Sequence, residues 1–298
     1  MKVFITGTTG YIGNAVARAM RRAGHDVFGL VRSEPAARQL AAQEIQPVLG
    51  RMQDAGTYSR VAEECSVIIH AAVDYSDRTA ESPLLDALLA GAGKGATPKT
   101  FIYTSGVWVY GNTGLQSVDE TTPLTPAALV TWRPAVERRV LESSGIRGVV
   151  IRPGCVYGQR GGLTAEWMMG ATGQKPFRVI GDGENRWTMV HVEDLAQAYV
   201  LAAESGRSGE VFNVTDRSRS RIREMAEGVA AVAGFKDQIQ YIPVSKAAET
   251  LGGFAECLAL DQHVDSSKAV RLLGWQPRHG GFLDGVRTYF EAWRASQA

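Results

Sequence analysis

Residues 6–13 read TGTTGYIG, and this segment constrains the fold of the chain more than any other. It lies between a short apolar run and an amphipathic stretch, and its three glycines are three residues apart. Gly7 permits a tight turn, Gly10 lets the backbone approach a pyrophosphate, and Gly13 lets a helix pack close to a strand. The first amides of that helix would face the phosphates. The segment therefore predicts a strand–turn–helix unit that binds a dinucleotide, and the alternative is a glycine-rich turn without a ligand.

Apolar runs alternate with helical patterns over the first half of the chain. The runs predict buried strands, and the patterns between them predict helices. Such alternation is typical of parallel strands joined by right-handed crossovers. We therefore expect an α/β fold, a Rossmann-like doubly wound parallel sheet with a smaller, partly interleaved C-terminal α/β substrate lobe. The strands are expected near residues 2–6, 25–32, 45–50, 66–73, 99–106 and 146–154, and helices near 11–24, 36–43, 82–95 and 134–144.

The pattern loosens after Pro153, which suggests where the lobes divide. Residues 1–152 are expected to form the dinucleotide-binding domain, and residues 188–220 to rejoin it. Residues 153–187 and 221–298 are expected to form the substrate lobe. Within the rejoining segment, a helix is expected to be capped by Glu193 or Asp194.

Composition excludes several classes of partner. The formal net charge is +1, so neither nucleic acid nor an anionic membrane is an expected partner. No apolar run approaches the ~18 residues of a membrane span. Three cysteines without a CxxC pair predict reduced thiols, with no disulfide framework and no metal site. We expect a cytoplasmic protein.

Five further motifs follow the glycine turn in order along the chain. They are IIHAA (68–72), YTSGVWVYG (103–111), IRPGCVYG (151–158), GDGENRWTMVHVEDLAQA (181–198) and DSSKAVRLLGWQP (265–277). With TGxxGxxG, they resemble the extended or atypical short-chain dehydrogenase/reductase superfamily, in its NAD(P)-dependent epimerase/dehydratase branch. The resemblance implies a dinucleotide across the carboxyl edge of the sheet and a small-molecule substrate. It also implies a possible homodimer built from the helices near 83–92 and 134–144.

The end of the second expected strand bears on the choice of nucleotide. An NAD site usually carries an acidic residue there for the ribose diol, whereas this chain has Val31, Arg32 and Ser33. A guanidinium can hold a 2′-phosphate, so NADP(H) is favoured over NAD(H). The alternative is that Arg32 is a solvated loop charge. The predicted cofactor contacts are Gly7, Thr9, Gly10, Tyr11, Ile12, Gly13, Arg32, Met52, Ala71, Ala72, Thr104, Arg133, Pro153 and Gly154.

Members of the family that this chain resembles usually carry the catalytic motif Tyr-x-x-x-Lys, and this chain lacks it. Aligning the glutamate that commonly follows that lysine with Glu137 puts Arg133 at the lysine position and Leu129 at the tyrosine position. Leucine cannot donate a proton, and arginine is a poor acid because its pKa is high. Pro134 is expected in the first turn of the helix, because it lacks an amide hydrogen. The surface that bears the pair in relatives is therefore expected to be rebuilt.

Replacement groups must come from strand ends at the same edge of the sheet. The candidate catalytic residues are Ser105, Tyr110, Arg133 and Asp74, and the candidate substrate contacts are Tyr75, Trp108, Tyr110, Tyr157, Arg186 and Trp187. Core packing, a helix cap or a solvated charge is the alternative for each. Three functions stay open at this point. They are an oxidoreductase acting on a small carbonyl or imine with a non-standard proton donor, an epimerase, dehydratase or isomerase without net redox, and a non-catalytic NADP(H) sensor or scaffold.

Overall fold

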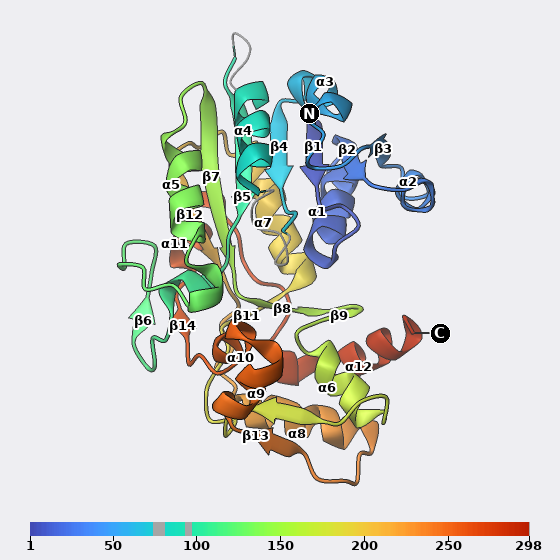
Figure 1. The fold of residues 1–298 in the computed structure, drawn as a ribbon, viewed down its shortest axis with the longest axis vertical. Helices are drawn as coiled ribbons and strands as arrows, with labels where there is room; N and C mark the ends of the chain where they lie inside the picture. Colours follow the sequence, from blue (N-terminus) through green and yellow to red (C-terminus); the bar gives the residue numbers. More distant parts are fainter. Residues whose placement is uncertain (74–80, 93–96, 298) are drawn as a thin grey trace.

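The computed structural model describes residues 1–73, 81–92 and 97–297. Its main element is a sheet of seven parallel strands in the order β12–β7–β5–β4–β1–β2–β3 (Figure 1). The predicted Rossmann-like α/β fold is thereby confirmed. The strands are β1 (Lys2–Thr6), β2 (Asp26–Val31), β3 (Gln46–Leu49), β4 (Val67–His70), β5 (Lys99–Thr104), β7 (Ile146–Pro153) and β12 (Glu210–Val214).

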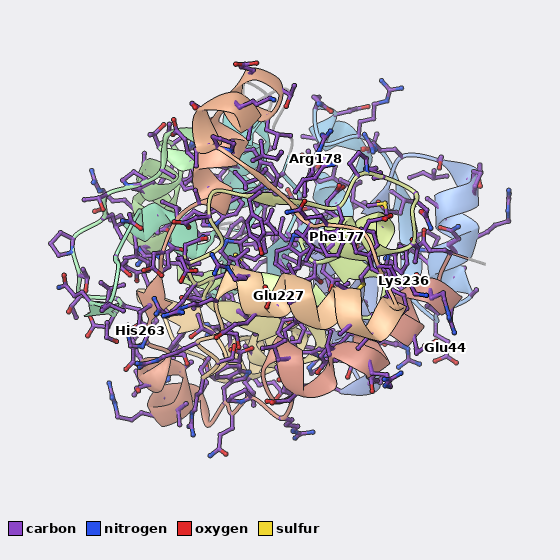
Figure 2. The ribbon with its side chains drawn as sticks, turned by 90° about the horizontal axis from the view of Figure 1, so that it is seen from below. Glu44, Phe177, Arg178, Glu227, Lys236 and His263 are labelled. Carbon is purple, nitrogen blue, oxygen red and sulfur yellow. The ribbon has the colours of Figure 1, made fainter. Side chains whose placement is uncertain are left out.

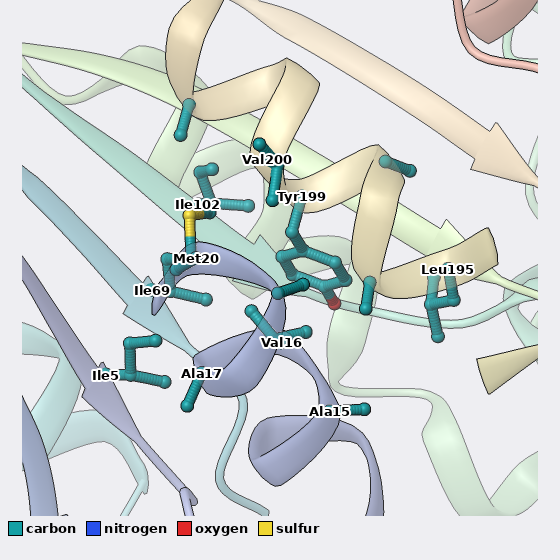
Figure 3. Close-up of a cluster of buried hydrophobic side chains, with 14 of the residues drawn as sticks. Ile5, Ala15, Val16, Ala17, Met20, Ile69, Ile102, Leu195, Tyr199 and Val200 are labelled. Carbon is teal, nitrogen blue, oxygen red and sulfur yellow. The ribbon is translucent and has the colours of Figure 1, made fainter. Parts of the chain in front are cut away.

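Alternate side chains of each strand enter two separate cores. Val3 and Ile5 of β1 join one core, and Phe4 joins the other. The first face is covered by α1 (Tyr11–Arg22), α2 (Glu34–Ala41), α7 (Val192–Glu204) and α11 (Ser267–Leu273), and the second by α3 (Ser59–Glu64), α4 (Glu81–Ala92) and α5 (Arg133–Glu142). Figure 3 shows Val16 and Met20 of α1 meeting Tyr199 of α7 above the strands. Burial on both faces explains why the strands are apolar runs without alternation.

The strand order fixes where a ligand can lie. The chain runs outward from β1 through β2 to β3, and then returns to place β4 on the other side of β1. The order therefore reverses between β1 and β4, and the loops at their carboxyl ends diverge. Ligands of doubly wound sheets bind in the crevice at such a switch point.

A second lobe lies below the sheet in Figure 1. Figure 2, seen from below, shows α8 with Glu227 crossing this lobe close to Phe177. Phe177, Met225 and Phe290 belong to its own buried core. The lobe contains α6 (Ala165–Ala171), β10 (Arg178–Ile180), α8 (Ile222–Ala233), β13 (Gln240–Ile242), α9 (Val244–Leu251), α10 (Gly253–Leu258) and α12 (Val286–Ala295).

Short strands connect the two parts of the chain. One three-stranded sheet has the order β11 (Met189–His191), β8 (Cys155–Gly158) and β9 (Gly161–Gly162). A two-stranded pair joins β14 (His263–Val264) to β6 (Ser117–Val118). In the rejoining segment, β12 pairs with β7 in the main sheet, whereas β11 pairs with β8 outside it. The division of the chain at residues 152 and 153 stays a prediction.

Two local expectations can be compared with the structure. The expectation that Glu193 or Asp194 caps α7 is wrong, because the Nδ1 atom of His191 accepts the hydrogen bond from the Glu193 amide and both acidic residues lie in the first turn. All three cysteines, Cys65, Cys155 and Cys257, are free and buried. Within the described residues, no helix has the length and apolar character needed to cross a membrane.

Candidate active site

The glycine turn has the geometry that the sequence predicts. Gly7 has a φ of +78°, and a Cβ atom there would lie 2.7 Å from the Ala71 carbonyl oxygen. A Cβ atom on Gly13 would lie 2.1 Å from the Gly7 carbonyl oxygen, because α1 begins directly against the turn. No side chain caps α1 at Gly10. The first amides of the helix therefore remain available for an anion.

A cavity of about 550 Å³ opens beside this turn. It lies at the switch point between β1 and β4, and its wall continues along the ends of β2 and β3. Every predicted cofactor contact from Gly7 to Ala72 lines it. Its lining residues are Gly7, Thr9, Gly10, Tyr11, Ile12, Gly13, Leu30, Val31, Arg32, Gly50, Met52, Gln53, Ala71, Ala72 and Val73. We call it the glycine-turn cavity.

Two arginines stand at the far end of the glycine-turn cavity. Arg32 and Arg51 line an adjoining hollow of about 540 Å³ together with Gln53. Within the described ranges, neither guanidinium forms an ion pair. Glu34 does not line either space, because it lies in the first turn of α2, which Ser33 caps. The two cations are thus placed to attract an anionic group at the adenosine end of a dinucleotide.

A second, smaller cavity of about 250 Å³ adjoins the first, since Tyr11 and Ile12 line both. We call it the apolar cavity. Most of its wall is hydrocarbon, and it includes five of the predicted site residues beyond the turn, namely Ser105, Trp108, Arg133, Pro153 and Gly154. Its lining residues are Tyr11, Ile12, Ser105, Gly106, Val107, Trp108, Val130, Arg133, Pro153, Gly154, Cys155, Val156, Gly162 and Leu163.

The surface that would carry Tyr-x-x-x-Lys is rebuilt around Arg133. Leu129 lies in a short 3₁₀ turn (Ala128–Val130), and Arg133 is the first residue of α5, with Pro134 in its first turn. The Arg133 side chain is 5% exposed, and its Nη1 donates to the Thr104 carbonyl oxygen at 2.7 Å. Arg133 therefore brings a fixed positive charge to the apolar cavity, and leucine at position 129 brings no proton donor.

Ser105 and Tyr110 belong to a buried polar network behind the apolar cavity. The Ser105 hydroxyl donates to Glu137, and Arg152 donates to both Glu137 carboxylate oxygens, at 3.1 Å from Nε and 2.5 Å from Nη2. Arg152 Nη1 also donates to the Tyr110 hydroxyl at 2.7 Å, and that hydroxyl donates to Asn213 Oδ1 at 2.9 Å. The Tyr110 side chain is 2% exposed and lines neither cavity. This placement opposes the predicted catalytic and substrate roles of Tyr110.

Two other predicted substrate contacts, Tyr157 and Trp187, line neither of these cavities. Tyr157 is fully buried, and its hydroxyl donates to the Gly280 carbonyl oxygen at 2.6 Å. Trp187 stacks on Trp167 with centroids 5.1 Å apart, inside the core of the lower lobe. Both therefore pack rather than face a substrate. Trp108 does line the apolar cavity.

Four more predicted residues are Arg186, Thr104, Asp74 and Tyr75, and the first two line neither the glycine-turn cavity nor the apolar cavity. Arg186 lines a different cavity of about 500 Å³ and pairs with Asp261 at 3.5 Å. The Thr104 hydroxyl accepts from Tyr199 at 2.7 Å and does not line the two cavities. Asp74 and Tyr75 lie outside the described residues.

Sequence reasoning missed the two charged members of the buried network. In the sequence, Glu137 serves only to align the helix with the family motif, and Arg152 follows the apolar run 149–151 directly in β7. A charged residue next to a buried apolar run predicts a buried ion pair, because a buried charge needs a partner. This pattern in the sequence could have identified Arg152. Leu163 and Val130 of the apolar cavity carry no comparable signal.

One histidine-rich cluster invites a metal interpretation. His191, Glu193 and His279 bring ligand-type atoms within 4.8 Å of one another. The two imidazole rings stack with centroids 3.6 Å apart and planes 20° apart. The lone pairs of nearly parallel rings do not converge on one point, and His191 Nδ1 is occupied by the Glu193 amide. The arrangement is therefore one of packing between α7 and the segment before α12.

The buried His70 predicts a loss of stability in acid. Its side chain is 1% exposed, and burial, followed by the nearby Arg133 guanidinium, lowers the pKa of His70 to about 4. The unfolded chain binds this proton near pH ~6.5. The free energy of unfolding should therefore fall by about 1–3 kcal/mol as the pH drops through this interval, because only the unfolded state gains the proton.

Urea denaturation of the wild type and of His70→Asn at a series of pH values measures this term. The variant should lose less stability than the wild type between neutral pH and the folded-state pKa of His70. Parallel curves for the two proteins would show that His70 does not stay neutral in the folded state.

The chain matches known proteins along most of its length. The model of the NAD dependent epimerase/dehydratase family matches residues 3–215. An uncharacterized protein of Schizosaccharomyces pombe is 29% identical over 294 residues, covering 95% of this chain and 97% of that protein. A 4-hydroxy-2-methyl-3-oxo-4-farnesyl-3,4-dihydroquinoline-1-oxide ketoreductase of Stigmatella aurantiaca is 30% identical over 267 residues, covering 85% of this chain and 80% of that protein. The solved dTDP-glucose 4,6-dehydratase of Bacillus anthracis, in complex with NAD, has a TM-score of 0.82 at 19% identity over 100% of this chain and 97% of that one.

Proposed function

This chain belongs to the NAD dependent epimerase/dehydratase family and is an enzyme of that kind, and from this premise we propose that it is an NADP(H)-dependent oxidoreductase of a small organic carbonyl or imine. The observation that carries the proposal is the pair of adjoining cavities. One offers a helix terminus and Arg32 to a dinucleotide, with Arg51 in the adjoining hollow, and the other offers an apolar space with one buried cation. The ketoreductase of Stigmatella aurantiaca is a relative with a reductive activity in its name.

The residues around the glycine turn fit a nicotinamide dinucleotide. The uncapped amides at the start of α1 suit its pyrophosphate, and Gly7 and Gly13 leave room for the turn to close. Arg32 and Arg51 suit a 2′-phosphate. Tyr11 and Ile12, at the junction of the cavities, would lie against the nicotinamide end. When bound, the dinucleotide donates or accepts a hydride.

The described residues of the apolar cavity divide the remaining work. Trp108, Val107 and Leu163 exclude water and hold the substrate by contact. Arg133 stabilises negative charge that develops on the substrate oxygen, because it is fixed and nearly buried. Ser105 turns its proton toward Glu137, so we assign it a positioning role. A homodimer through α4 and α5 and a cytoplasmic location remain predictions.

Parallel calorimetric titrations with NADPH and NADH test the proposed function, after a check that no nucleotide has co-purified. Binding of NADPH near micromolar Kd, with much weaker binding of NADH, would support the assignment. Failure of a folded, empty protein to bind either nucleotide would refute it. Product formed without net change in the nucleotide would instead select an epimerase or dehydratase.

Arg32→Ala should weaken NADPH binding by ~1.5–3 kcal/mol and leave NADH binding nearly unchanged, because the lost interaction is a charge-assisted hydrogen bond to the 2′-phosphate. Arg38→Ala is the matched control, since Arg38 is an exposed arginine of α2 that does not line the glycine-turn cavity. Titration calorimetry of both variants with both nucleotides makes the comparison. Equal losses for NADPH and NADH would contradict the choice of NADP(H).

A further inference from the structure

The apolar cavity is built almost entirely from hydrocarbon. The side chains that face it beyond the nucleotide junction are Val107, Trp108, Val130, Cys155, Val156 and Leu163, with Ser105 and Arg133 as the polar ones. Among the side chains that the structure describes, in residues 1–73, 85–90, 92 and 97–297, no carboxylate or amide lines it. Hydroxyl groups of a bound sugar would find few hydrogen-bond partners here, and burying them unpaired would cost free energy.

The cavity is also small and apolar at its rim. Trp108 meets the ring of Phe254 from α10 edge-on, with centroids 5.9 Å apart. Leu129 lies beside Gly253, the first residue of α10, where a Cβ atom would meet the Leu129 Cβ at 3.7 Å. A volume of about 250 Å³ falls below the ~300–1,000 Å³ of pockets for drug-sized ligands. Leu129 thus packs beside α10, whose Phe254 touches the cavity-lining Trp108.

Arg133 supplies the positive charge at the cavity wall. Its guanidinium is held in place by the Thr104 carbonyl oxygen, and its Cζ lies 4.9 Å from the centroid of the Trp132 ring. This guanidinium also lies near the buried His70, where its charge adds to burial in lowering the pKa of the imidazole. A cation at the wall of a water-poor space stabilises an oxyanion more strongly than one in solvent.

We propose that the substrate is a small, apolar, conjugated carbonyl compound that binds in the apolar cavity with its oxygen on Arg133. This inference rests on the proposed function and narrows it. It separates this chain from its structural neighbours that bind sugar nucleotides, such as the UDP-glucuronic acid 4-epimerase of Bacillus cereus.

The described groups of the cavity also indicate which carbonyl compounds suit it. The Tyr11 hydroxyl donates to the Gly158 carbonyl oxygen at 2.6 Å, and burial raises the pKa of Tyr11 well above its usual value. Burial likewise raises the pKa of the Cys155 thiol to about 12. Neither group is an acid near neutral pH. A conjugated acceptor, such as an enone or a quinone, suits such a site because its oxyanion is delocalised, so water can protonate it after it leaves the cavity.

Reduction of a conjugated acceptor would need a hydride, which the bound reduced dinucleotide would supply. The hydride would form a new C–H bond at the far carbon of the conjugated system, and the C=C π pair would shift to form the enolate double bond. The π pair of the carbonyl group would end on the oxygen beside Arg133. The dinucleotide loses two electrons, the carbonyl compound gains them, and a proton from water completes the product.

Binding of two matched probes tests this proposal without any turnover. The protein is first saturated with NADP⁺ and then titrated by calorimetry with 4-nitrophenolate, which has an apolar ring and an oxyanion, and with nitrobenzene, which has the ring alone. Both should bind the wild type. Arg133→Met should weaken 4-nitrophenolate binding at least ~10-fold and nitrobenzene binding by less than ~2-fold. Arg138→Met, on the exposed side of α5, should change neither.

The outcomes separate this inference from the proposed function. If NADP⁺ binds but neither probe does, or if UDP-glucose binds the apolar cavity in their place, the substrate class is wrong and the nucleotide assignment stands. Equal losses for both probes in Arg133→Met would remove the oxyanion role of Arg133. If circular dichroism shows that Arg133→Met is unfolded, Arg133→Lys is used in its place. The lysine ammonium would not occupy the position of the guanidinium, so unchanged 4-nitrophenolate binding by this variant would overturn the role of the planar guanidinium. Failure to bind NADP⁺ would refute the proposed function itself.

Discussion

Glu137→Ala should lower the free energy of unfolding by about 3–5 kcal/mol, because it leaves the Arg152 guanidinium buried without its carboxylate. The side chains of Glu137 and Arg152 are 3% and 5% exposed, and they are joined by two hydrogen bonds. The Ser105 hydroxyl would lose its acceptor in the same variant. Urea denaturation followed by circular dichroism measures the change.

Two further variants show whether the cost comes from the unpaired charge. Glu142→Ala removes an exposed carboxylate at the end of the same helix, and it should change the stability by less than about 0.5 kcal/mol. The double variant Glu137→Met/Arg152→Met should recover much of the loss, since apolar side chains can replace a buried ion pair. A small effect of Glu137→Ala alone would mean that water reaches Arg152.

This network also explains why two of the sequence-based catalytic candidates sit where they do. Ser105 directly follows β5, and Tyr110 is the last residue of the short 3₁₀ turn that comes next (Val107–Tyr110). The Ser105 hydroxyl donates to Glu137 of α5, and the Tyr110 hydroxyl accepts from Arg152 of β7. Neither hydroxyl is therefore directed at a ligand in the cavity. The network ties the carboxyl ends of neighbouring strands to α5, and α5 in turn presents Arg133. Its effect on catalysis would therefore be indirect, through the placement of the Arg133 guanidinium.

The fold could be predicted because its signals are local. Gly7 and Gly13 mark a turn that other residues fit poorly, and apolar runs such as 67–70 report burial on both faces of a sheet. Arg32 and Met52 reach the glycine-turn cavity because they follow β2 and β3 directly, and parallel strands end at one edge. A position given by the end of a strand is thus predictable from sequence.

The substrate end could be predicted much less well. Tyr157, Trp187 and Trp108 all belong to family motifs and lie in or near strands. Of the three, Trp108 alone lines the apolar cavity. Their different fates depend on partners distant in sequence, such as Gly280 for the Tyr157 hydroxyl and Trp167 for the Trp187 ring. Aromatic side chains carry the same local signal whether they pack in a core or face a ligand.

Gly13→Ala should weaken NADPH binding by about 10- to 100-fold, the scale expected when a hydrogen bond of about 1.5–3 kcal/mol to a charged phosphate is lost. The added Cβ atom would lie 2.1 Å from the Gly7 carbonyl oxygen, a backbone atom that cannot rotate away. The start of α1 must then shift, and its amides move relative to the phosphates that they would bind. The same overpacking should cost about 1–3 kcal/mol of folding stability.

Gly56→Ala is the matched control for this substitution. Gly56 lies in a short exposed turn (Ala55–Thr57) after β3, and the nearest atom to an added Cβ is an Asp54 carboxylate oxygen at 3.4 Å, which is ordinary contact. That variant should bind NADPH like the wild type. Calorimetric titration of both variants, each checked for folding by thermal denaturation, decides the matter. If Gly13→Ala folds and binds NADPH with unchanged Kd, the nucleotide does not lie on the N-terminus of α1, and the glycine-turn cavity serves another ligand.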